Sequence, residues 1–348
     1  MSFEKVLKNK KILITGNTGF KGSWLSLCLL SLGAKVYGFS NEIKTQPSLY
    51  KALKLKKKIK QYWGDVANYN RVNKIFNKIK PDVVFHLAAQ SLVFDSYEKP
   101  LMTFKTNIMG TANIIELIYK YSIKSSIIIT SDKVYENLNI KRGYIESDKL
   151  MGVDPYSASK SAAEIVINSF QKSYKKKDVY IAVTRAGNVI GGGDWSKNRI
   201  VPDIINSWIN NKKLMIRSPT AVRPWQHVLE PINAYIYLSV ELLKKNKKLN
   251  MQCFNVGPAP GNKKSVSQLL KIFKRKINFN IKIKKEKKYE AKLLILNSNK
   301  IYNLAGWKSK LNFIQTIYLT IDWYISYYKD KNKIYAFSIN QIKKYFSL

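Results

Sequence analysis

Short runs of apolar residues alternate with segments of helical periodicity through the first half of the chain. Because the runs are apolar at nearly every position, each predicted strand should be covered on both faces, which is typical of the parallel sheet of a doubly wound α/β fold. The predicted strands are residues 11–15, 35–39, 83–87, 126–130 and 179–186. The predicted helices between them are residues 20–32, 68–79, 100–120 and 156–175.

The regular alternation ends near residue 190 and gives way to loops rich in Gly, Pro and Trp, followed by mixed α/β patterns. We therefore predict two domains. Residues 1–190 form the larger one, to which 225–256 return, and residues 191–224 with 257–330 form a smaller C-terminal mixed α/β domain. The Lys- and Tyr-rich tail, 331–348, has an amphipathic pattern and is predicted to be a surface helix.

The composition is that of a globular protein, with 45% hydrophobic and 24% charged residues among 348. The net charge of +39 raises the question of nucleic-acid binding. The lysines are spread over every segment together with Ile, Asn, Tyr and Phe, which share AT-rich codons, and no nucleic-acid-binding module is recognisable. Nucleic acid is therefore not the expected partner, although the positive field would attract an anionic substrate.

The chain shows no pattern that predicts membrane insertion or disulfide bonding. The longest apolar run near the N-terminus, residues 24–32, is too short to span a bilayer and follows the first predicted strand. The two cysteines, Cys28 and Cys253, make neither a disulfide framework nor a metal cluster. We therefore expect a cytoplasmic protein.

Three glycines lie between the first predicted strand and the first long helix. Gly16, Gly19 and Gly22 form the pattern G-x-x-G-x-x-G. Glycines there tighten the turn and let the backbone approach a pyrophosphate at the helix N-terminus, where free N–H groups and the helix dipole favour an anion. The loop therefore predicts dinucleotide binding by the larger domain.

An acidic residue that would bind the cofactor ribose is missing from the end of the second strand, which reads Phe39-Ser40-Asn41. Either Ser40 or Asn41 makes a weaker ribose contact, or a 2′-phosphate is tolerated, so the choice of NAD over NADP stays open. Asp65 is well placed to meet an adenine amino group, with a helix N-cap as the alternative.

Tyr156 and Lys160 are four residues apart and would share one face of a helix. A lysine there can lower the pKa of the tyrosine by stabilising the phenolate. The spacing alone is weak evidence, because Tyr50 with Lys54 repeats it. The context distinguishes Tyr156, which follows a proline at a predicted helix start and lies 25 residues after Ser131 (156 − 131).

Together these motifs resemble the nucleotide-sugar branch of the extended short-chain dehydrogenase/reductase family. The glycine loop, HLAAQ (86–90), TNIMGT (106–111), the TSDK strand end, YSASK and TRAGNVIGGGDW (184–195) occur in that family's order, over about residues 8–328. The resemblance implies a Rossmann sheet, NAD, and a homodimer or higher oligomer formed through helices 100–120 and 156–175. The cofactor-binding residues it implies are Gly16, Gly19, Phe20, Gly22, Asp65, Val66, Ala88, Ala89, Tyr156 and Lys160.

The residues after the fourth of these strands separate reactions within that branch. Epimerases usually carry small, non-ionisable residues there, whereas 4,6-dehydratases need an acid and a base to eliminate water, and most are similar in placing Asp-Glu. Asp132-Lys133, followed by Tyr135 and Asn137, instead resembles the CDP-glucose 4,6-dehydratases. The stretches GNTGFKGSWLSL and AVRPWQHVLEP (221–231) resemble the same subgroup and imply CDP-glucose as substrate.

The resemblance implies a reaction in three steps. Tyr156 takes the C4 hydroxyl proton through or beside Ser131 while hydride leaves C4; Asp132 and Lys133 then share the elimination, and hydride returns to C6. Which of the pair is the base stays open, since a lysine base must be neutral and an ion pair between them would defeat both roles.

The remaining candidates are substrate ligands and residues with structural alternatives. Asn188 would bind sugar-side phosphates, with a turn as the alternative. Arg223 is the strongest diphosphate ligand because a guanidinium fits phosphate oxygens in a fork. The weaker substrate-binding candidates are Gln90, Arg199 and Arg217. No metal is expected: His86 and His227 are predicted to be packed, Trp225 to be core and Asn107 to be structural.

The rival functions are another nucleotide-sugar 4,6-dehydratase acting on a GDP- or dTDP-sugar, a nucleotide-sugar 4-epimerase, and a non-catalytic dinucleotide sensor. The sensor predicts loss of catalytic residues, yet Ser131, Tyr156 and Lys160 are all present.

Overall fold

The computed structural model describes residues 3–138, 140, 142–174, 178–187, 189–283 and 294–348. Its centre is a seven-stranded sheet in the order β11-β6-β5-β4-β1-β2-β3, and every pair in it is parallel. This order confirms the doubly wound Rossmann arrangement predicted from the apolar runs. The strands are β1 (Lys11–Thr15), β2 (Lys35–Ser40), β3 (Lys60–Trp63), β4 (Val83–His86), β5 (Ser125–Ile129), β6 (Ile181–Ala186) and β11 (Gln252–Val256).

Two helical layers explain why consecutive residues of the central strands are apolar. Ile12 and Ile14 face the cluster beneath α2 (Phe20–Ser31) and α10 (Leu229–Leu243), whereas Leu13 faces the cluster under the opposite helices. Those opposite helices are α4 (Tyr69–Ile79), α7 (Gly110–Lys120) and α8 (Pro155–Ser173). Burial on both faces is the pattern expected of a parallel sheet.

The predicted helix 100–120 is interrupted. It forms α6 (Pro100–Phe104), one π-helical turn (Lys105–Met109) and α7, and it follows a short helix, α5 (Val93–Glu98). Such turns within helices are frequent at functional sites. Here the π turn carries Asn107, whose side-chain amide donates to the Gln90 carbonyl at 3.0 Å and to the Ser159 hydroxyl at 2.8 Å. Asn107 therefore ties this helix to the loop after β4 and to α8, as predicted.

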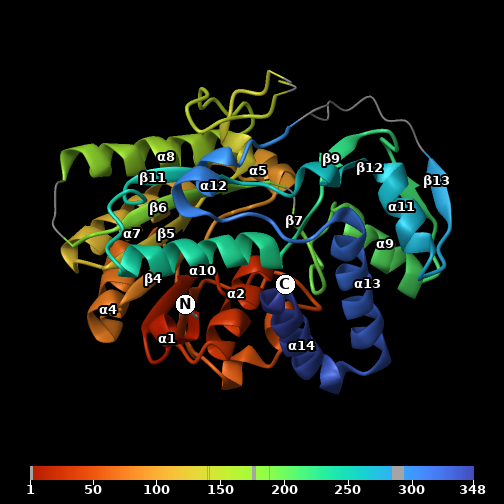
Figure 1. Cartoon of the computed structure of the whole chain (residues 1–348), viewed down its shortest axis with the longest axis horizontal. Coiled ribbons are helices and arrows are strands. Elements are labelled where there is room, and N and C mark those ends of the chain that lie inside the picture. Colours follow the sequence, from red (N-terminus) through yellow and green to blue (C-terminus); the bar gives the residue numbers. More distant parts are fainter. Residues whose placement is uncertain (1–2, 139, 141, 175–177, 188, 284–293) are drawn as a thin grey trace.

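The C-terminal part combines helices with two-stranded pairs. Figure 1 shows α9, α11 and α13 together at one end of the molecule, and α4, α7 and α8 at the other. The pairs are β7 with β10, β8 with β13 and β9 with β12. The short strands of this part are β7 (Val189–Ile190), β8 (Leu214–Ile216), β9 (Val222–Pro224), β10 (Gln226–His227), β12 (Lys263–Ser265) and β13 (Ile281–Ile283). Its helices are α9 (Ile200–Ile209), α11 (Val266–Lys274), α12 (Asn299–Ala305), α13 (Phe313–Lys329) and α14 (Ile334–Ser347). Two short helices nearer the N-terminus are α1 (Phe3–Leu7) and α3 (Leu49–Ala52).

The tail forms the predicted helix, α14, which packs on α2 and α13. The Tyr345 hydroxyl donates to the buried carboxylate of Glu230 at 2.8 Å, and the rings of Phe3 and Phe346 meet edge to face at 5.9 Å. One hydrophobic cluster runs through α2, α10, α13 and α14, so the division into two domains stays a prediction. Within the described ranges, no helix is long and apolar enough to cross a membrane.

Candidate active site

The glycine loop links β1 to α2 at the carboxyl edge of the sheet. Gly16 has φ +74°, and a Cβ there would lie 2.7 Å from the Ala88 nitrogen; a Cβ on Gly22 would lie 2.2 Å from the Gly16 carbonyl. These two glycines are therefore required by the protein's own packing. A Cβ on Gly19 would meet only the Gly16 carbonyl at 3.4 Å, and no side chain caps α2. The N-terminus of α2 is thus open to an anionic ligand.

The end of β2 holds amides and a hydroxyl where a carboxylate is often found. The Ser40 hydroxyl donates to Asn17 Oδ1 at 2.9 Å, and the Asn17 amide donates to Gln61 Oε1 at 2.7 Å. Ser40 is buried and Asn41 is exposed. The Asp65 carboxylate accepts from the Ala67 N–H at 2.9 Å and is exposed, whereas Asn68 caps α4, so the N-cap alternative for Asp65 was wrong.

Two further predicted cofactor contacts lie beside this loop. The Ala88 N–H donates to the Thr15 hydroxyl at 3.2 Å, and Ala89 follows it, partly exposed. Val66 is buried against Gly110, where a Cβ would lie 2.6 Å from a Val66 methyl carbon. Phe20, the first residue of α2, packs on the Gly191 backbone, so its ring fixes the loop after β7 to the start of the helix.

The predicted acid–base segment follows β5. Ser131 caps a single 3₁₀ turn (Asp132–Val134) by accepting from the Lys133 N–H at 3.2 Å, and its hydroxyl donates to Asp132 Oδ1 at 3.1 Å. Asp132 is buried, with Oδ2 3.1 Å from where a Gly187 Cβ would stand. Burial raises the pKa of the Asp132 carboxyl above its ordinary value, against the opposing effects of Lys133, the Ser131 hydroxyl and Lys21. Lys133 is partly exposed, and it makes no ion pair with Asp132.

Tyr156 and Lys160 lie on the first turns of α8, which begins at Pro155 and is capped by Asp154. Both side chains are buried, and Lys160 Nζ donates to the Ile129 carbonyl at 3.3 Å. Burial raises the pKa of Tyr156 to about 12, although the Ser131 hydroxyl opposes it. In the protein alone, the pKa of Tyr156 is therefore raised and not lowered as the spacing suggested, because loss of solvation outweighs the opposing effects of the Ser131 hydroxyl and Arg199.

Lys21 is the residue that sequence reasoning missed. It lies in the first turn of α2, and burial together with the Arg199 charge lowers its pKa to about 8, while Asp132 opposes the shift. It also helps burial to lower the pKa of Lys160 to about 8. The sequence did hold one sign that Lys21 is unusual. A cation in the first turn of a helix opposes the helix dipole, so lysine is unfavourable at this position.

The predicted substrate ligands divide into three groups. Arg199 pairs with the buried Asp194 at 2.9 Å and acts electrostatically on Tyr156, so it lies at the site. Gln90 is buried, and its side-chain amide forms hydrogen bonds with the Leu92 backbone and the Thr103 hydroxyl, which favours a structural role. Arg223 lies partly exposed on β9, Arg217 is exposed after β8, and Asn188 lies outside the described residues.

The histidines and Trp225 have the structural roles that were predicted. His86 Nδ1 is 2.7 Å from the Thr15 hydroxyl and its Nε2 is 3.1 Å from the Thr111 hydroxyl, while His227 Nδ1 accepts from the Leu229 N–H at 3.3 Å. Burial lowers both histidine pKa values to about 3. Trp225 is buried, with its indole N–H on the Lys264 carbonyl. No metal-ligating cluster of His, Cys, Asp or Glu occurs in the described part of the chain.

The strand order and the glycine loop define a doubly wound protein of the Rossmann type, with ionisable side chains gathered at the carboxyl ends of its strands. The sequence model of the GDP-mannose 4,6 dehydratase family matches residues 13–320. The chain is 36% identical to CDP-glucose 4,6-dehydratase of Salmonella typhimurium, over 98% of this chain and 97% of that protein. The chain belongs to the GDP-mannose 4,6 dehydratase family.

More distant relatives include epimerases. UDP-glucose 4-epimerase of Pisum sativum is 24% identical over 88% of this chain and 93% of its own. UDP-glucose 4-epimerase of Thermotoga maritima superposes with a TM-score of 0.80 at 24% identity, over 92% of this chain and 100% of its own. dTDP-glucose 4,6-dehydratase of Bacillus anthracis, solved in complex with NAD, superposes with a TM-score of 0.75 at 23% identity, over 91% of this chain and 97% of its own. These similarities confirm the predicted fold class.

Proposed function

We propose that this protein is an NAD-dependent CDP-glucose 4,6-dehydratase, which converts CDP-glucose to CDP-4-dehydro-6-deoxyglucose. The observation that carries the proposal is the buried Asp132, followed by Lys133, at the strand end that also holds Ser131 and faces Tyr156. An epimerase needs no acid–base pair there, whereas elimination of water does. The relationship to the Salmonella enzyme along almost the whole chain supports CDP-glucose as the substrate.

The residues of the glycine loop fit NAD. Gly19 leaves space before the first turn of α2, whose free N–H groups suit a pyrophosphate, and the Asn17–Ser40 pair offers polar atoms to a ribose. The cofactor contacts we assign are those from Gly16 to Gly22 and those of Asp65, Val66, Ala88 and Ala89. When bound, NAD supplies a reversible acceptor for the hydride of C4.

Tyr156 is assigned the proton of the C4 hydroxyl, with the Ser131 hydroxyl beside it as a hydrogen-bond partner. Lys160 stabilises the phenolate form as the proton leaves. The raised pKa of Asp132 favours its protonated form, so we assign Asp132 as the acid that protonates the leaving C6 hydroxyl. Lys133 is left to take the C5 proton, which the 4-ketone acidifies.

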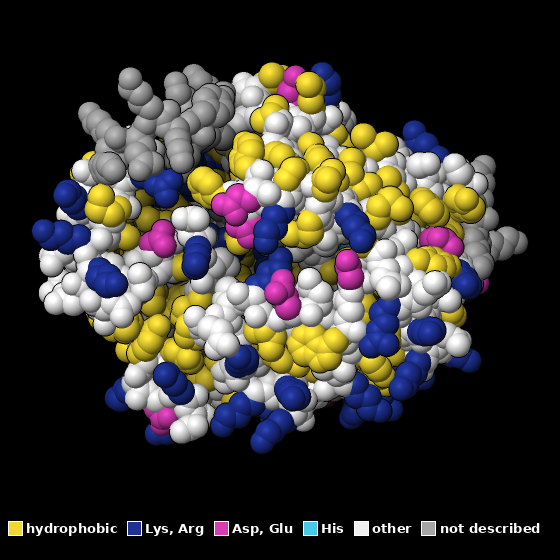
Figure 2. Space-filling model, turned by 180° about the vertical axis from the view of Figure 1, so that it is seen from behind, with side chains coloured by type: hydrophobic (Ala, Val, Ile, Leu, Met, Phe, Trp, Pro, Cys, Tyr) yellow, Lys and Arg dark blue, Asp and Glu magenta, His cyan; other side chains and the backbone are white. Residues whose placement is uncertain are grey.

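The substrate diphosphate is assigned to the arginines. Arg199 acts electrostatically on Tyr156, Arg223 lies on β9, Arg217 directly follows β8, and Asn188 is kept as a candidate. Figure 2 shows Lys and Arg side chains spread widely over one face with few acidic ones, a field that attracts a nucleotide sugar.

A homodimer is the proposed assembly. Apolar side chains stand exposed on α6, the π turn and α8, which lie within the segments from which a dimer was expected, and on the adjoining α5; Leu101 of α6 is 82% exposed and Tyr97 of α5 64%. Contiguous exposed apolar side chains mark association surfaces. Two unpaired cysteines fit a reducing compartment, and we propose the cytoplasm.

The test is to incubate the purified protein with NAD and, separately, CDP-, dTDP-, UDP- and GDP-glucose and GDP-mannose. A 4-keto-6-deoxy product from CDP-glucose, with no net NADH, is the expected result. An epimer that keeps its C6 oxygen, or turnover restricted to another nucleotide, would overturn the assignment.

A further inference from the structure

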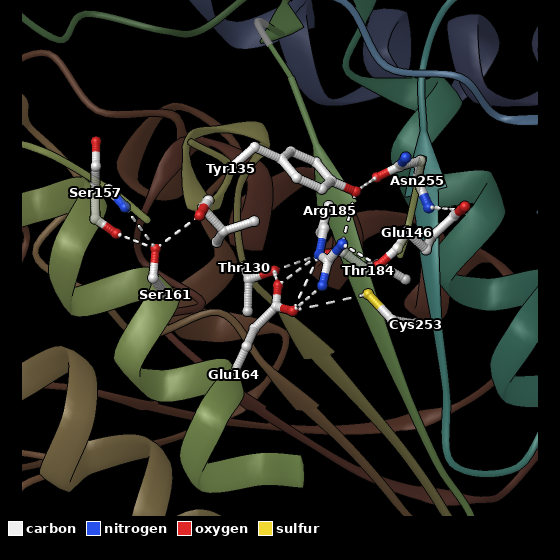
Figure 3. Close-up of polar contacts among 12 residues, drawn as sticks. Thr130, Tyr135, Glu146, Ser157, Ser161, Glu164, Thr184, Arg185, Cys253 and Asn255 are labelled. Atoms are coloured by element: carbon white, nitrogen blue, oxygen red, sulfur yellow. Dashed lines mark hydrogen bonds and ion pairs between the residues drawn. The ribbon is translucent and has the colours of Figure 1, made fainter. Parts of the chain in front are cut away.

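A buried ion pair contacts Thr130 and Tyr135, which flank the acid–base segment (Figure 3). Glu164 of α8 and Arg185 of β6 have side chains 5% and 4% exposed. Arg185 Nε donates to both carboxylate oxygens at 2.9 and 3.0 Å, and its Nη2 donates to Oε2 as well. Because desolvation offsets much of the attraction in a buried pair, its presence calls for a reason other than stability.

The pair anchors both ends of the acid–base segment. The Thr130 hydroxyl donates to Glu164 Oε1 at 2.5 Å, and Arg185 Nη1 donates to the Tyr135 hydroxyl at 2.6 Å, with the guanidinium 4.7 Å from the Tyr135 ring centre. Thr130 immediately precedes Ser131, and Tyr135 follows Lys133 by two residues. Four residues lie between these anchors, and the first three of them, Ser131, Asp132 and Lys133, are those assigned to the chemistry.

The same carboxylate belongs to the helix that carries the tyrosine and the lysine. Tyr156, Lys160 and Glu164 are spaced by four residues and share one face of α8. The Ser161 hydroxyl adds a second link, donating to the Val134 carbonyl at 2.8 Å. Helix and segment are therefore fixed to each other through one ion pair and its neighbours.

The far side of the network reaches the edge of the sheet. The Tyr135 hydroxyl donates to Asn255 Oδ1 at 2.7 Å, and the Asn255 N–H donates to the Glu146 carboxylate at 2.7 Å. Arg185 also donates to the Glu146 carbonyl at 3.1 Å. Figure 3 shows these groups running from α8 across β6 to β11. Because every member has a partner, the anchors are held in one arrangement.

The charge of Glu164 also acts on Lys160. The charged or titratable groups that face Lys160 are Lys21 of α2, His86 of β4 and Glu164 itself. Burial and Lys21 lower the pKa of Lys160 to about 8, and Glu164 opposes them. Loss of this carboxylate would leave Lys160 facing only like charge and neutral groups.

We propose that Glu164 and Arg185 are positioning residues: they hold Ser131, Asp132 and Lys133 in register with Tyr156, and Glu164 keeps Lys160 protonated. The kinetic part of this inference rests on the proposed function, and the charge part does not.

The positioning part is tested by removing single hydroxyls. Tyr135→Phe and Thr130→Val detach one anchor each and leave the ion pair in place. Tyr144→Phe is the matched control, because Tyr144 is equally buried and stacks on Tyr135 at 5.0 Å, but its hydroxyl accepts from the Leu138 N–H. We expect kcat to fall about tenfold in the two anchor variants with KM within about twofold, since small displacements of reacting groups are costly. Equal losses in Tyr144→Phe would overturn the proposal.

The charge part is tested with Glu164→Gln, which keeps the shape of the side chain. Without the negative charge Lys160 loses its proton at lower pH, so the alkaline limb of kcat should move down by roughly half to one pH unit. Pulse acetylation with acetic anhydride, read residue by residue by mass spectrometry across pH, measures the same shift at Lys160 without substrate. An unchanged labelling midpoint would overturn the charge role.

The double variant Glu164→Gln/Arg185→Met removes the unpaired guanidinium that could unfold the single variant. Its labelling midpoint should be displaced in the same direction by a smaller amount, because the positive charge of Arg185 is lost as well. If wild-type protein turns over none of the sugars, the proposed function fails, while the labelling result still decides the charge role at Lys160.

Discussion

The two sides of the site are built differently. The acid–base side stands on strands of five and six residues and a helix of 19, and a hydrogen-bond network joins Thr130, Glu164, Arg185 and Tyr135 across them. The arginine side stands on strands of two or three residues. There, buried Gln226 has no hydrogen-bond partner for either amide atom within the described ranges. A rigid side suits chemistry that nucleotide-sugar enzymes share, and a side of short segments suits the choice of substrate.

The largest effect should come from the rigid side. Tyr156→Phe removes the group that takes the C4 proton, so turnover should fall about 10³-fold. Product formation from CDP-glucose measures the loss, and an unchanged melting temperature is the control for folding. Activity within tenfold of wild type would contradict the assignment.

Asp132→Asn and Lys133→Met separate oxidation from elimination. Both should lower formation of the deoxysugar by about 10²- to 10³-fold, because each lacks one proton-transfer group. Oxidation at C4 should persist, so NADH should appear on mixing with substrate in stopped-flow absorbance. Equal loss of both steps would mean that the pair only shapes the site.

Arg223→Met tests the arginine side. Loss of a diphosphate contact should raise KM for the nucleotide sugar about tenfold and leave kcat within about twofold. Arg275→Met is the matched control, since Arg275 is an exposed cation at the end of α11. A fall in kcat at constant KM would mean that Arg223 acts in the chemical step and does not bind the diphosphate of the substrate.

Lys21→Met should have a smaller effect. The positive charge of Lys21 lowers the pKa of Asp132, so its removal raises that pKa further. An acid that stays protonated to higher pH should move the alkaline limb of the elimination step up, on the order of half a pH unit. Lys51→Met, an exposed lysine of α3, should leave the profile unchanged.

The smallest effect compares the two sides through their histidines. His86 and His227 have folded pKa values of about 3 against an ordinary 6.5, so the unfolded chain binds more protons between these limits and stability falls as pH falls through them. Each should contribute up to about 1.4 kcal/mol per pH unit. Urea unfolding between pH 7 and 5 should show a reduced slope in His86→Gln and in His227→Gln; an unchanged slope in either would mean that histidine is solvated.

The sheet could be predicted because its signal is local. Residues 12–14 and 127–129 are consecutive apolar residues, and the structure buries alternate residues of each run in opposite clusters. Helix 100–120 was predicted as one piece, because the π turn at 105–109 is dictated by contacts of Asn107 with residues 17 and 52 positions away. No periodicity within that segment carries this information.

The site was predictable where residues adjoin in sequence, as in Ser131-Asp132-Lys133 and Tyr156 with Lys160. Lys21 required knowledge that α2 begins opposite α8 and α9, and the pKa of Tyr156 required its burial. Neither follows from spacing. The buried Glu164–Arg185 pair likewise joins residues 21 positions apart on different elements.

The packing of α14 on α2 has a consequence for synthesis on the ribosome. Helix α2 leaves the exit tunnel well before α14, which packs on it and begins only at Ile334. The Glu230 carboxylate likewise gains its hydrogen bond from the Tyr345 hydroxyl only after α14 has been made. Although earlier segments generally fold first during translation, the part of α2 that α14 covers stays exposed until α14 has been made, and exposed apolar surface of this kind is what chaperones bind.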